Sequence, residues 1–316
     1  MSTHISRAVT LLKQKGKDIS VISTNKIPSK VDNVQYIQPM LLWILVFKKK
    51  SIVHFHVDSL PHLILAYILS PFHKTYLTVH NNRYPSDFSK STFRIKLKRI
   101  LLKSFHKIIS VNSESTAFLQ LHFQNIHPET IPAFLPPQTI DRNSLLEIKQ
   151  FTKDFKHVLS GYVYRLSFFN GQDLYGLDMM VDLTERLVKK ELDICLVLLI
   201  NLDESEYLDE IRKRVKEKNI FDRILFVDTK NGVDAVALWE HSDVYLRPTN
   251  TDGNSISILE ALYVKTKVVA SDCVERPEGC YTFHSRDVSD FERATIQSLE
   301  DTSTSETITF KLIEYE

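Results

Sequence analysis

The residues with the clearest chemistry lie in a polar loop and at the start of the helix predicted to follow it. Residues 244–247 form an apolar strand pattern, and after Pro248 the polar residues 249–254 lead into a helical pattern. Gly253 permits close approach of a ligand to the backbone. The N–H groups and the dipole of a helix start favour an anion such as a diphosphate. The expected anion-binding residues are Gly253, Asn254, Ser255, Ile256 and Ser257.

Two carboxylates flank this expected anion site. Asp252 lies in the mouth of the loop, and Glu260 lies two turns into the predicted helix. Because carboxylate oxygens accept hydrogen bonds, each of the two can accept from sugar hydroxyls at opposite ends of a bound anion. Carboxylates at this spacing are common, and capping of the helix by Asp252 is the open alternative.

The wider sequence around the two carboxylates carries a family resemblance. Residues 247–262 read RPTNTDGNSISILEAL, and VVASD at 268–272 and RPEG at 276–279 follow. This string resembles family 4 glycosyltransferases of the GT-B fold, whose signature is two acidic residues separated by seven. Asp252 stands here in place of the usual first glutamate. The longer string is similar to a subgroup that acts on bacterial surface polysaccharides such as capsule and O-antigen.

This resemblance implies a retaining glycosyltransferase that moves a sugar from a UDP- or GDP-sugar to a saccharide or a lipid-linked saccharide. It implies that Glu260 holds the ribose and that the helix start near Ser255 holds the diphosphate. It also implies that Asp252 and His80 orient the sugar. The nucleotide-sugar is a co-substrate, and no other cofactor is expected. No metal is expected, because backbone N–H groups and an arginine can stabilise the leaving diphosphate.

A cationic side chain for the donor phosphates is expected near the start of the second domain. The resemblance implies an arginine and a lysine at this place. Arg165, which follows a predicted strand ending at Tyr164, is the candidate for the arginine, because its planar fork suits phosphate oxygens. A structural ion pair is the alternative for Arg165. The lysine expected beside Gly176 is absent, since Tyr175 stands there.

Histidines lie on two predicted strands of the first half. His80 ends an apolar strand pattern and precedes a polar loop, and the resemblance implies that it contacts the donor sugar. A structural histidine is the alternative. His54 and His56 alternate with Phe55 and superficially resemble metal ligands. No nearby cysteine or carboxylate pair completes a coordination shell, so no metal site is expected.

Apolar strand patterns alternate with amphipathic helical patterns along the whole chain, which indicates parallel sheets covered on both faces. Prolines between residues 132 and 137 interrupt the alternation and mark a hinge. The predicted fold class is α/β of the GT-B type, with two doubly wound Rossmann-like domains and a ligand cleft between them, where the carboxyl ends of the strands lie. The predicted parts are an acceptor- and membrane-facing domain at 1–136, a donor domain at 137–300 and a tail at 301–316. The expected strands are 19–24, 52–56, 75–80, 107–112, 130–134, 157–164, 193–200, 224–228, 244–247 and 267–271, and the expected helices are 3–15, 60–70, 90–104, 113–123, 175–190, 204–218, 233–241 and 255–264.

Charge is distributed unevenly between the halves. Residues 1–150 carry a net charge of +12, and the remainder carries −11. The pattern over 93–103 predicts a basic amphipathic helix, with Phe93, Leu97, Ile100 and Leu101 on one face and Lys96, Arg99 and Lys103 on another. Such a helix favours peripheral contact with an anionic membrane or a lipid-pyrophosphate acceptor. An ordinary sheet-covering helix is the alternative, and nucleic acid is not expected, because stacking aromatics are not interleaved with the basic residues.

Three cysteines, no secretory signal and no apolar stretch of spanning length predict a cytoplasmic protein, peripheral on the cytoplasmic face of the membrane if the basic helix binds there. The first strand and Gly-Gly loop of the resembling family are missing before residue 3. Either the true start lies upstream of Met1 or the chain is a truncated form. Two rival functions therefore stay open, which are a non-catalytic partner subunit of a glycosyltransferase and a nucleotide-sugar epimerase of similar fold.

Overall fold

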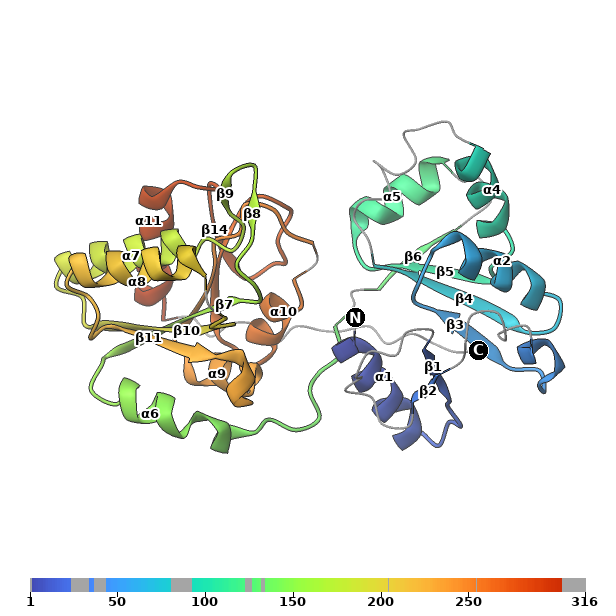
Figure 1. The fold of residues 1–316 in the computed structure, drawn as a ribbon, viewed down its shortest axis with the longest axis horizontal. Helices are drawn as coiled ribbons and strands as arrows, with labels where there is room; N and C mark the ends of the chain where they lie inside the picture. The colour runs from blue at the N-terminus through green and yellow to red at the C-terminus, as the bar shows by residue number, and fades with distance from the viewer. Residues whose placement is uncertain are drawn as a thin grey trace. The chain divides into compact units, whose positions relative to one another are not determined.

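The computed structural model describes residues 2–23, 34–36, 44–80, 93–122, 127–131, 134–203, 205–253 and 255–302 (Figure 1). The chain divides into two compact units, and the boundary falls between Leu135 and Pro136. Among the described residues, we call the part before this boundary unit 1 and the part after it unit 2. Of the predicted tail at 301–316, only Asp301 and Thr302 lie within the described residues. Each unit is an α/β structure built on a parallel sheet.

Unit 1 contains a four-stranded parallel sheet in the order β3-β4-β5-β6, together with a separate parallel pair β1-β2. Its core consists of apolar residues of the sheet and of helices α2, α4 and α5, with Leu63, Leu77 and Leu102 fully buried. The strands are β1 (Val21–Ser23), β2 (Val34–Tyr36), β3 (Ile52–Phe55), β4 (Lys74–Val79), β5 (Lys107–Ser110) and β6 (Glu129–Thr130). The helices are α1 (Ser2–Gln14), α2 (Leu60–Leu69), α4 (Phe93–Leu102) and α5 (Ser113–His122).

Unit 2 contains a six-stranded parallel sheet in the order β11-β10-β7-β12-β13-β14. The strands read as continuous apolar runs because both faces of the sheet are covered, and every residue of β10 is buried. The strands are β7 (His157–Val163), β10 (Ile194–Ile200), β11 (Ile224–Asp228), β12 (Val244–Arg247), β13 (Lys267–Ser271) and β14 (Cys280–Phe283). A short antiparallel hairpin, β8 (Phe168–Phe169) with β9 (Gln172–Asp173), follows β7.

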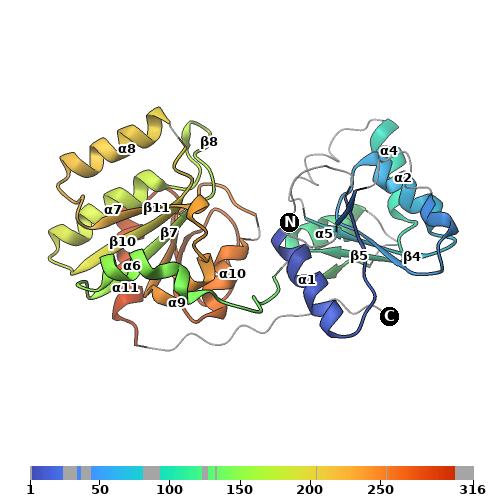
Figure 2. The same ribbon diagram turned by 60° about the horizontal axis from the view of Figure 1, so that its bottom comes forward.

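The helices of unit 2 cover the two faces of its sheet. Residues of α7, α8 and α11 form one buried cluster with the sheet, and residues of α6, α9 and α10 form the other. Figure 2 shows α7 and α8 on one side of the strands and α9 and α10 on the opposite side. The helices are α6 (Leu146–Thr152), α7 (Leu177–Lys189), α8 (Glu206–Glu217), α9 (Ala235–His241), α10 (Ile256–Tyr263) and α11 (Val288–Glu300), with 3-10 turns at Arg142–Leu145 and Thr229–Asn231.

The strand order of unit 2 defines a topological switch point. From β7 the chain runs outward through β10 to β11, and it then returns to place β12 on the other side of β7. The connections leaving β7 and β12 therefore pass to opposite faces of the sheet. In open parallel sheets, ligands bind outside the carboxyl ends of the strands at this point. The loops that follow β7 and β12 are consequently the first place to look for a functional site.

Candidate functional site

The start of helix α10 lies at this switch point and has the features of an anion site. The side chain of the N-cap residue Ser255 makes no capping hydrogen bond to the backbone of the helix. Its hydroxyl instead contacts Ser257 Oγ at 3.0 Å, and Ser257 Oγ lies 2.7 Å from the hydroxyl of Tyr245. In most helices the side chain of the N-cap residue accepts a hydrogen bond from one of the first backbone N–H groups. The side chain of Ser255 therefore leaves the first N–H groups of α10 uncapped, and uncapped N–H groups at a helix start favour an anion.

The other residues predicted for the anion site lie close by in the chain. Gly253 is exposed and Ile256 is half-buried, whereas Asn254 falls outside the described residues. Glu260 lies on the second turn of α10 and is buried, with 8% of its surface exposed. Arg165 lies two residues after the end of β7 and is exposed. Within the described residues no ion pair of Arg165 is found.

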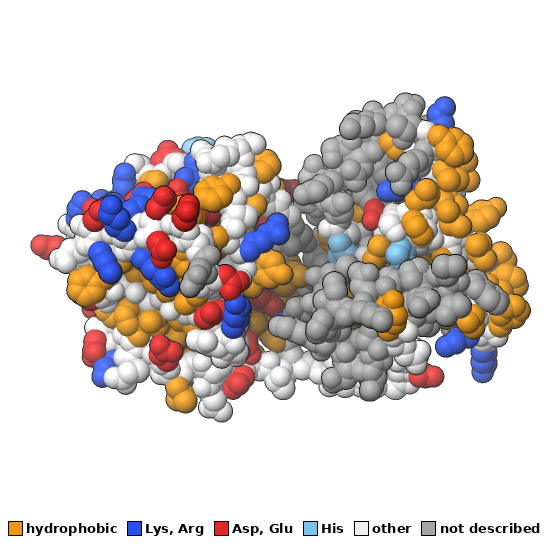
Figure 3. All heavy atoms as spheres, viewed as in Figure 1, with side chains coloured by type: hydrophobic (Ala, Val, Ile, Leu, Met, Phe, Trp, Pro, Cys, Tyr) orange, Lys and Arg blue, Asp and Glu red, His pale blue; other side chains and the backbone are white. Residues whose placement is uncertain are grey.

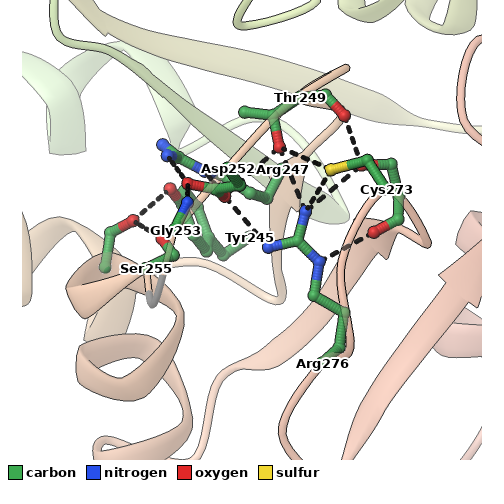
Figure 4. A network of polar contacts seen from close by, with 10 residues as sticks. Tyr245, Arg247, Thr249, Asp252, Gly253, Ser255, Cys273 and Arg276 are labelled. Atoms are coloured by element: carbon green, nitrogen blue, oxygen red, sulfur yellow. Dashed lines mark hydrogen bonds and ion pairs between the residues drawn. The ribbon is translucent and has the colours of Figure 1, made fainter. Parts of the chain in front are cut away.

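Asp252 is bound on all sides by groups of its own chain (Figure 4). Arg247 Nε and Nη2 donate to its two oxygens at 3.0 and 3.1 Å, and Arg276 Nη1 donates at 2.9 Å. Thr249 Oγ1 donates at 3.2 Å, and the backbone N–H of Gly253 donates at 2.9 Å. Among the described residues, the backbone N–H bound by Asp252 is that of Gly253, which precedes α10, so the expected capping of α10 by Asp252 is not found there. Its expected role in orienting the sugar stays a prediction.

Arg276 is the member of this cluster to which the sequence assigned no role. Its side chain is only 2% exposed. Besides Asp252, it donates through Nε to Ser271 O at 2.7 Å and through Nη2 to Thr249 Oγ1 at 3.0 Å. Nη2 also lies 3.3 Å from Cys273 Sγ. Arg276 thereby joins the loop after β12 to the segment after β13. These two strands are parallel neighbours in the sheet.

The electrostatics of the cluster keep Asp252 ionised. Burial by itself raises the pKa of a carboxyl group, but the guanidinium groups of Arg247 and Arg276 outweigh this effect and hold the pKa of Asp252 below its ordinary value. Two arginines face one carboxylate here, so the cluster carries an excess of one positive charge. A buried excess of this sign lies close in the chain to the uncapped start of α10 and favours an anionic ligand.

The loop that follows β7 packs directly on the loop that follows β12. Gly176 has a φ of 68°, and a Cβ built on it would lie 2.3 Å from Pro248 O. The backbone N–H of Asn250 donates to Leu174 O at 3.1 Å. The ring of Tyr175, which stands where the resembling family has a lysine, lies 5.2 Å from the guanidinium carbon of Arg247. Tyr175 thus contributes a cation–π contact to an arginine of the cluster instead of a phosphate-binding cation.

Asp173 fixes the start of helix α7 in the same loop. Its carboxylate accepts from the backbone N–H groups of Tyr175 at 2.9 Å and Leu177 at 2.8 Å, and from the hydroxyl of Tyr207 at 2.8 Å. Burial raises the pKa of Asp173, and these hydrogen bonds oppose that shift. Because an internal carboxylate already occupies the start of α7, the α10 start is the better anion site of the two helices that flank the switch point.

In unit 1, histidines gather at the carboxyl ends of β3 and β4. His56 directly follows β3 and His80 directly follows β4. His56 Nδ1 lies 2.9 Å from His80 Nε2, and the two rings are stacked. His54 Nε2 contacts Thr78 Oγ1 at 2.8 Å. Among the described residues, no group of three or more His, Cys, Asp or Glu side chains could hold a metal ion.

The fold of the chain is similar to those of solved glycosyltransferase structures. It is similar to a glycosyltransferase from Rickettsia africae, with a TM-score of 0.65 and 12% sequence identity over 94% of this chain and 83% of that one. It is also similar to HepE of Anabaena in complex with UDP, with a TM-score of 0.63 and 16% identity over 94% of this chain and 80% of that one. The chain therefore has the GT-B fold of two Rossmann-like domains.

The sequence of unit 2 adds a family match. Residues 165–301, which begin at Arg165 and include the whole cluster around Asp252, match the family described as "Glycosyl transferases group 1". This match covers less than half of the chain. No curated protein matches the sequence. Unit 2 is thus similar to this family in sequence, and the chain is similar to solved glycosyltransferases in fold.

Proposed function

We propose that the protein is a glycosyltransferase that binds a nucleotide-sugar in unit 2 and transfers the sugar to a saccharide or lipid-linked saccharide. The observation that carries the proposal is the uncapped start of α10 at the switch point between β7 and β12. The diphosphate accepts hydrogen bonds from the N–H groups of this helix start and from the guanidinium group of Arg165. Its negative charge is favoured by the excess positive charge of the cluster around Asp252.

The carboxylate of Glu260 is proposed to accept hydrogen bonds from the ribose hydroxyls. Glu260 lies one helical turn after Ile256, so a nucleotide whose diphosphate occupies the helix start extends its nucleoside along α10. UDP is the first nucleotide to test, because solved structures of HepE contain UDP and, in one case, UDP together with glucose. His80 of unit 1 is proposed to orient the sugar, and transfer is proposed to retain the anomeric configuration.

The decisive experiment is turnover with a panel of UDP- and GDP-sugars in the presence and absence of saccharide and lipid-linked acceptors. The proposal predicts that nucleoside diphosphate is released and that the acceptor gains a sugar with retained configuration. Activity should persist in EDTA, since N–H groups and arginine supply the charge stabilisation. A changed sugar on the nucleotide without acceptor would identify an epimerase instead. Absence of binding by every nucleotide in the panel would refute the donor site.

The acceptor side is proposed to face a membrane, because unit 1 exposes an apolar surface beside basic residues. Helix α2 exposes Ile64, Tyr67 and Ile68, and helix α4, which packs against α2, exposes Phe93 and Ile100. Figure 3 shows hydrophobic side chains gathered on the part of unit 1 that carries these helices. We call these five side chains the apolar surface. The apolar face predicted for α4 is divided in the structure, because Leu101 is buried whereas Phe93 and Ile100 are 79% and 60% exposed.

Basic residues lie near one end of this surface. The ring of His73 contacts Leu45 O at 2.9 Å and the backbone N–H of Ser51 at 3.2 Å, which holds residues 45–51 beside the end of α2. This segment exposes Phe47 and three consecutive lysines at 48–50. Apolar side chains next to lysines suit a bilayer with anionic head groups, where each lysine contributes about 1 kcal/mol. No helix in the described part of the chain is long and apolar enough to cross a membrane.

Vesicle sedimentation tests this contact. The protein should sediment with vesicles that contain phosphatidylglycerol and much less with vesicles of phosphatidylcholine alone. Replacement of Tyr67 and Ile68 by Ser should reduce binding, whereas replacement of the exposed Phe221 of unit 2 by Ser, the matched control, should not. Equal binding by both variants, or equal binding to vesicles with and without phosphatidylglycerol, would contradict the proposed membrane contact. Self-association of the protein through the apolar surface would contradict it as well.

A further inference from the structure

We propose that Asp252 is a positioning residue, clamped by Arg247 and Arg276, that sets the shape of the diphosphate-binding loop and does not contact the donor sugar. The proposal rests on the proposed donor site and assigns different roles within it. It differs from the role that the resemblance gives to the first of the two acidic residues. It also assigns a role to Arg276, which lies outside the signature of two acidic residues.

The hydrogen-bonding capacity of Asp252 is already used within the chain. A carboxylate offers about four lone-pair sites. Within the described residues, Asp252 accepts from five donors, which are three guanidinium N–H groups, one hydroxyl and one backbone N–H. Its side chain is 8% exposed. A sugar hydroxyl would have to displace one of these charge-assisted bonds, and such bonds are about twice as strong as neutral ones.

The same contacts hold the loop in place. Arg247 is the last residue of β12, and Arg276 reaches the loop from the segment that follows β13. Ser271 Oγ donates to Thr249 O, which adds a second link between these two segments. Asp252 Oδ1 orients the backbone N–H of Gly253, two residues before the N-cap of α10. The clamp therefore determines where the N–H groups at the entrance of α10 point.

Arg276 and Thr249 are too deeply buried to contact a ligand directly. The side chain of Arg276 is 2% exposed, and Thr249 is fully buried. Any effect of these two residues on the donor must pass through the loop. The negative charge of Asp252 by itself lowers the affinity for a diphosphate, whereas its positioning of the loop raises that affinity. Removal of the Asp252 charge would raise the excess positive charge, and the electrostatic field alone would then bind a diphosphate more tightly.

Calorimetric titration with UDP and UDP-glucose, and with GDP and GDP-mannose as a second pair, separates these roles. If Asp252 is a positioning residue, Asp252→Asn should weaken binding of the nucleotide and of its sugar conjugate by the same factor of about ten. This factor corresponds to about one tenth of the molecules holding the loop in its binding-competent conformation. Arg276→Lys should do the same, because lysine keeps the charge but cannot reproduce the planar fork. Loss of affinity for the sugar conjugate alone, or tighter binding of both, overturns the proposal.

Controls keep the test independent of folding and of the donor site itself. Thr249→Val removes the hydroxyl that links Asp252 to Arg276 without changing charge, and it should weaken both ligands in parallel. A folded Thr249→Val variant with wild-type affinities would overturn the clamp. Arg142→Gln breaks a bidentate pair with Glu240 elsewhere in unit 2 and should leave both affinities unchanged. Failure of the wild-type protein to bind any of the four ligands refutes the donor site, which is a different result.

Discussion

The substitution Gly176→Ala tests how tightly the two loops at the switch point are packed. Gly176 has a φ of 68°, and an added Cβ would lie 2.3 Å from Pro248 O. A left-handed conformation costs a non-glycine residue roughly 1–2 kcal/mol. Extra atoms forced into a packed contact cost about 1–3 kcal/mol more. Gly176→Ala should therefore lower the free energy of unfolding of unit 2 by about 2–5 kcal/mol.

Gly232→Ala is the matched control for this substitution. Gly232 has a similar φ of 73°, but nothing lies within 4 Å of a Cβ built on it. The control therefore experiences the conformational cost alone, roughly 1–2 kcal/mol. The difference between the two variants isolates the contact with Pro248.

Tryptophan fluorescence during urea unfolding gives both values. In a Trp43→Phe background, Trp239 is the remaining tryptophan, and it is fully buried in unit 2. Gly176→Ala should also weaken UDP binding, because Pro248 begins the loop that leads to α10. Equal losses of stability for the two glycine variants would refute the close packing of the loops and, with it, the arrangement of the switch point.

Three further predictions concern the donor site. Arg165→Gln should weaken UDP binding by about 10–100-fold, the value of a charge-assisted hydrogen bond, and leave uridine binding unchanged in the same titration; equal loss for both ligands would place Arg165 away from the phosphates. His80→Ala should lower kcat by about tenfold or more while the Kd for UDP stays within about twofold, because His80 belongs to unit 1; a matching rise in that Kd would contradict its proposed role. The folded pKa of Asp252 is depressed, so its stabilising contribution is present above the unfolded value of about 3.9 and is lost as pH falls through the folded pKa. The difference in free energy of unfolding between the wild-type protein and Asp252→Asn should accordingly shrink below about pH 4, and a difference that stays constant from pH 6 to pH 3 would contradict the pairing.

Much of the fold follows from the sequence because buried parallel strands read as short apolar runs. The predicted bounds of β11, β12 and β13 agree with the structure. Short elements such as the β8–β9 hairpin were missed, since two-residue strands leave no periodic signal. The amphipathic helix α11 was also missed, although Phe291 and Ala294, three residues apart, are fully buried on one face. The apolar spacing of α11 would have revealed it.

The clamp around Asp252 was harder to foresee. Arg247 and Asp252 are close in the sequence, but their pairing requires the loop to fold back on the end of β12. Arg276 reaches Asp252 only because β12 and β13 are adjacent in the sheet, which is a tertiary effect. Helix α4 gives a similar lesson, because its packing on α2 buries Ile95 and leaves Phe93 and Ile100 exposed. Which apolar face of a helix is buried depends on its neighbours.

The central claim is that a nucleoside diphosphate binds along α10, and titration of Glu260→Gln with UDP and inorganic pyrophosphate tests it most directly. Glutamine keeps the shape of Glu260 but removes its charge. In this variant UDP binding should weaken by about 10–100-fold through loss of hydrogen bonds to the ribose, while pyrophosphate, which lacks a ribose, should bind as before. Unchanged UDP affinity in Glu260→Gln would contradict the central claim.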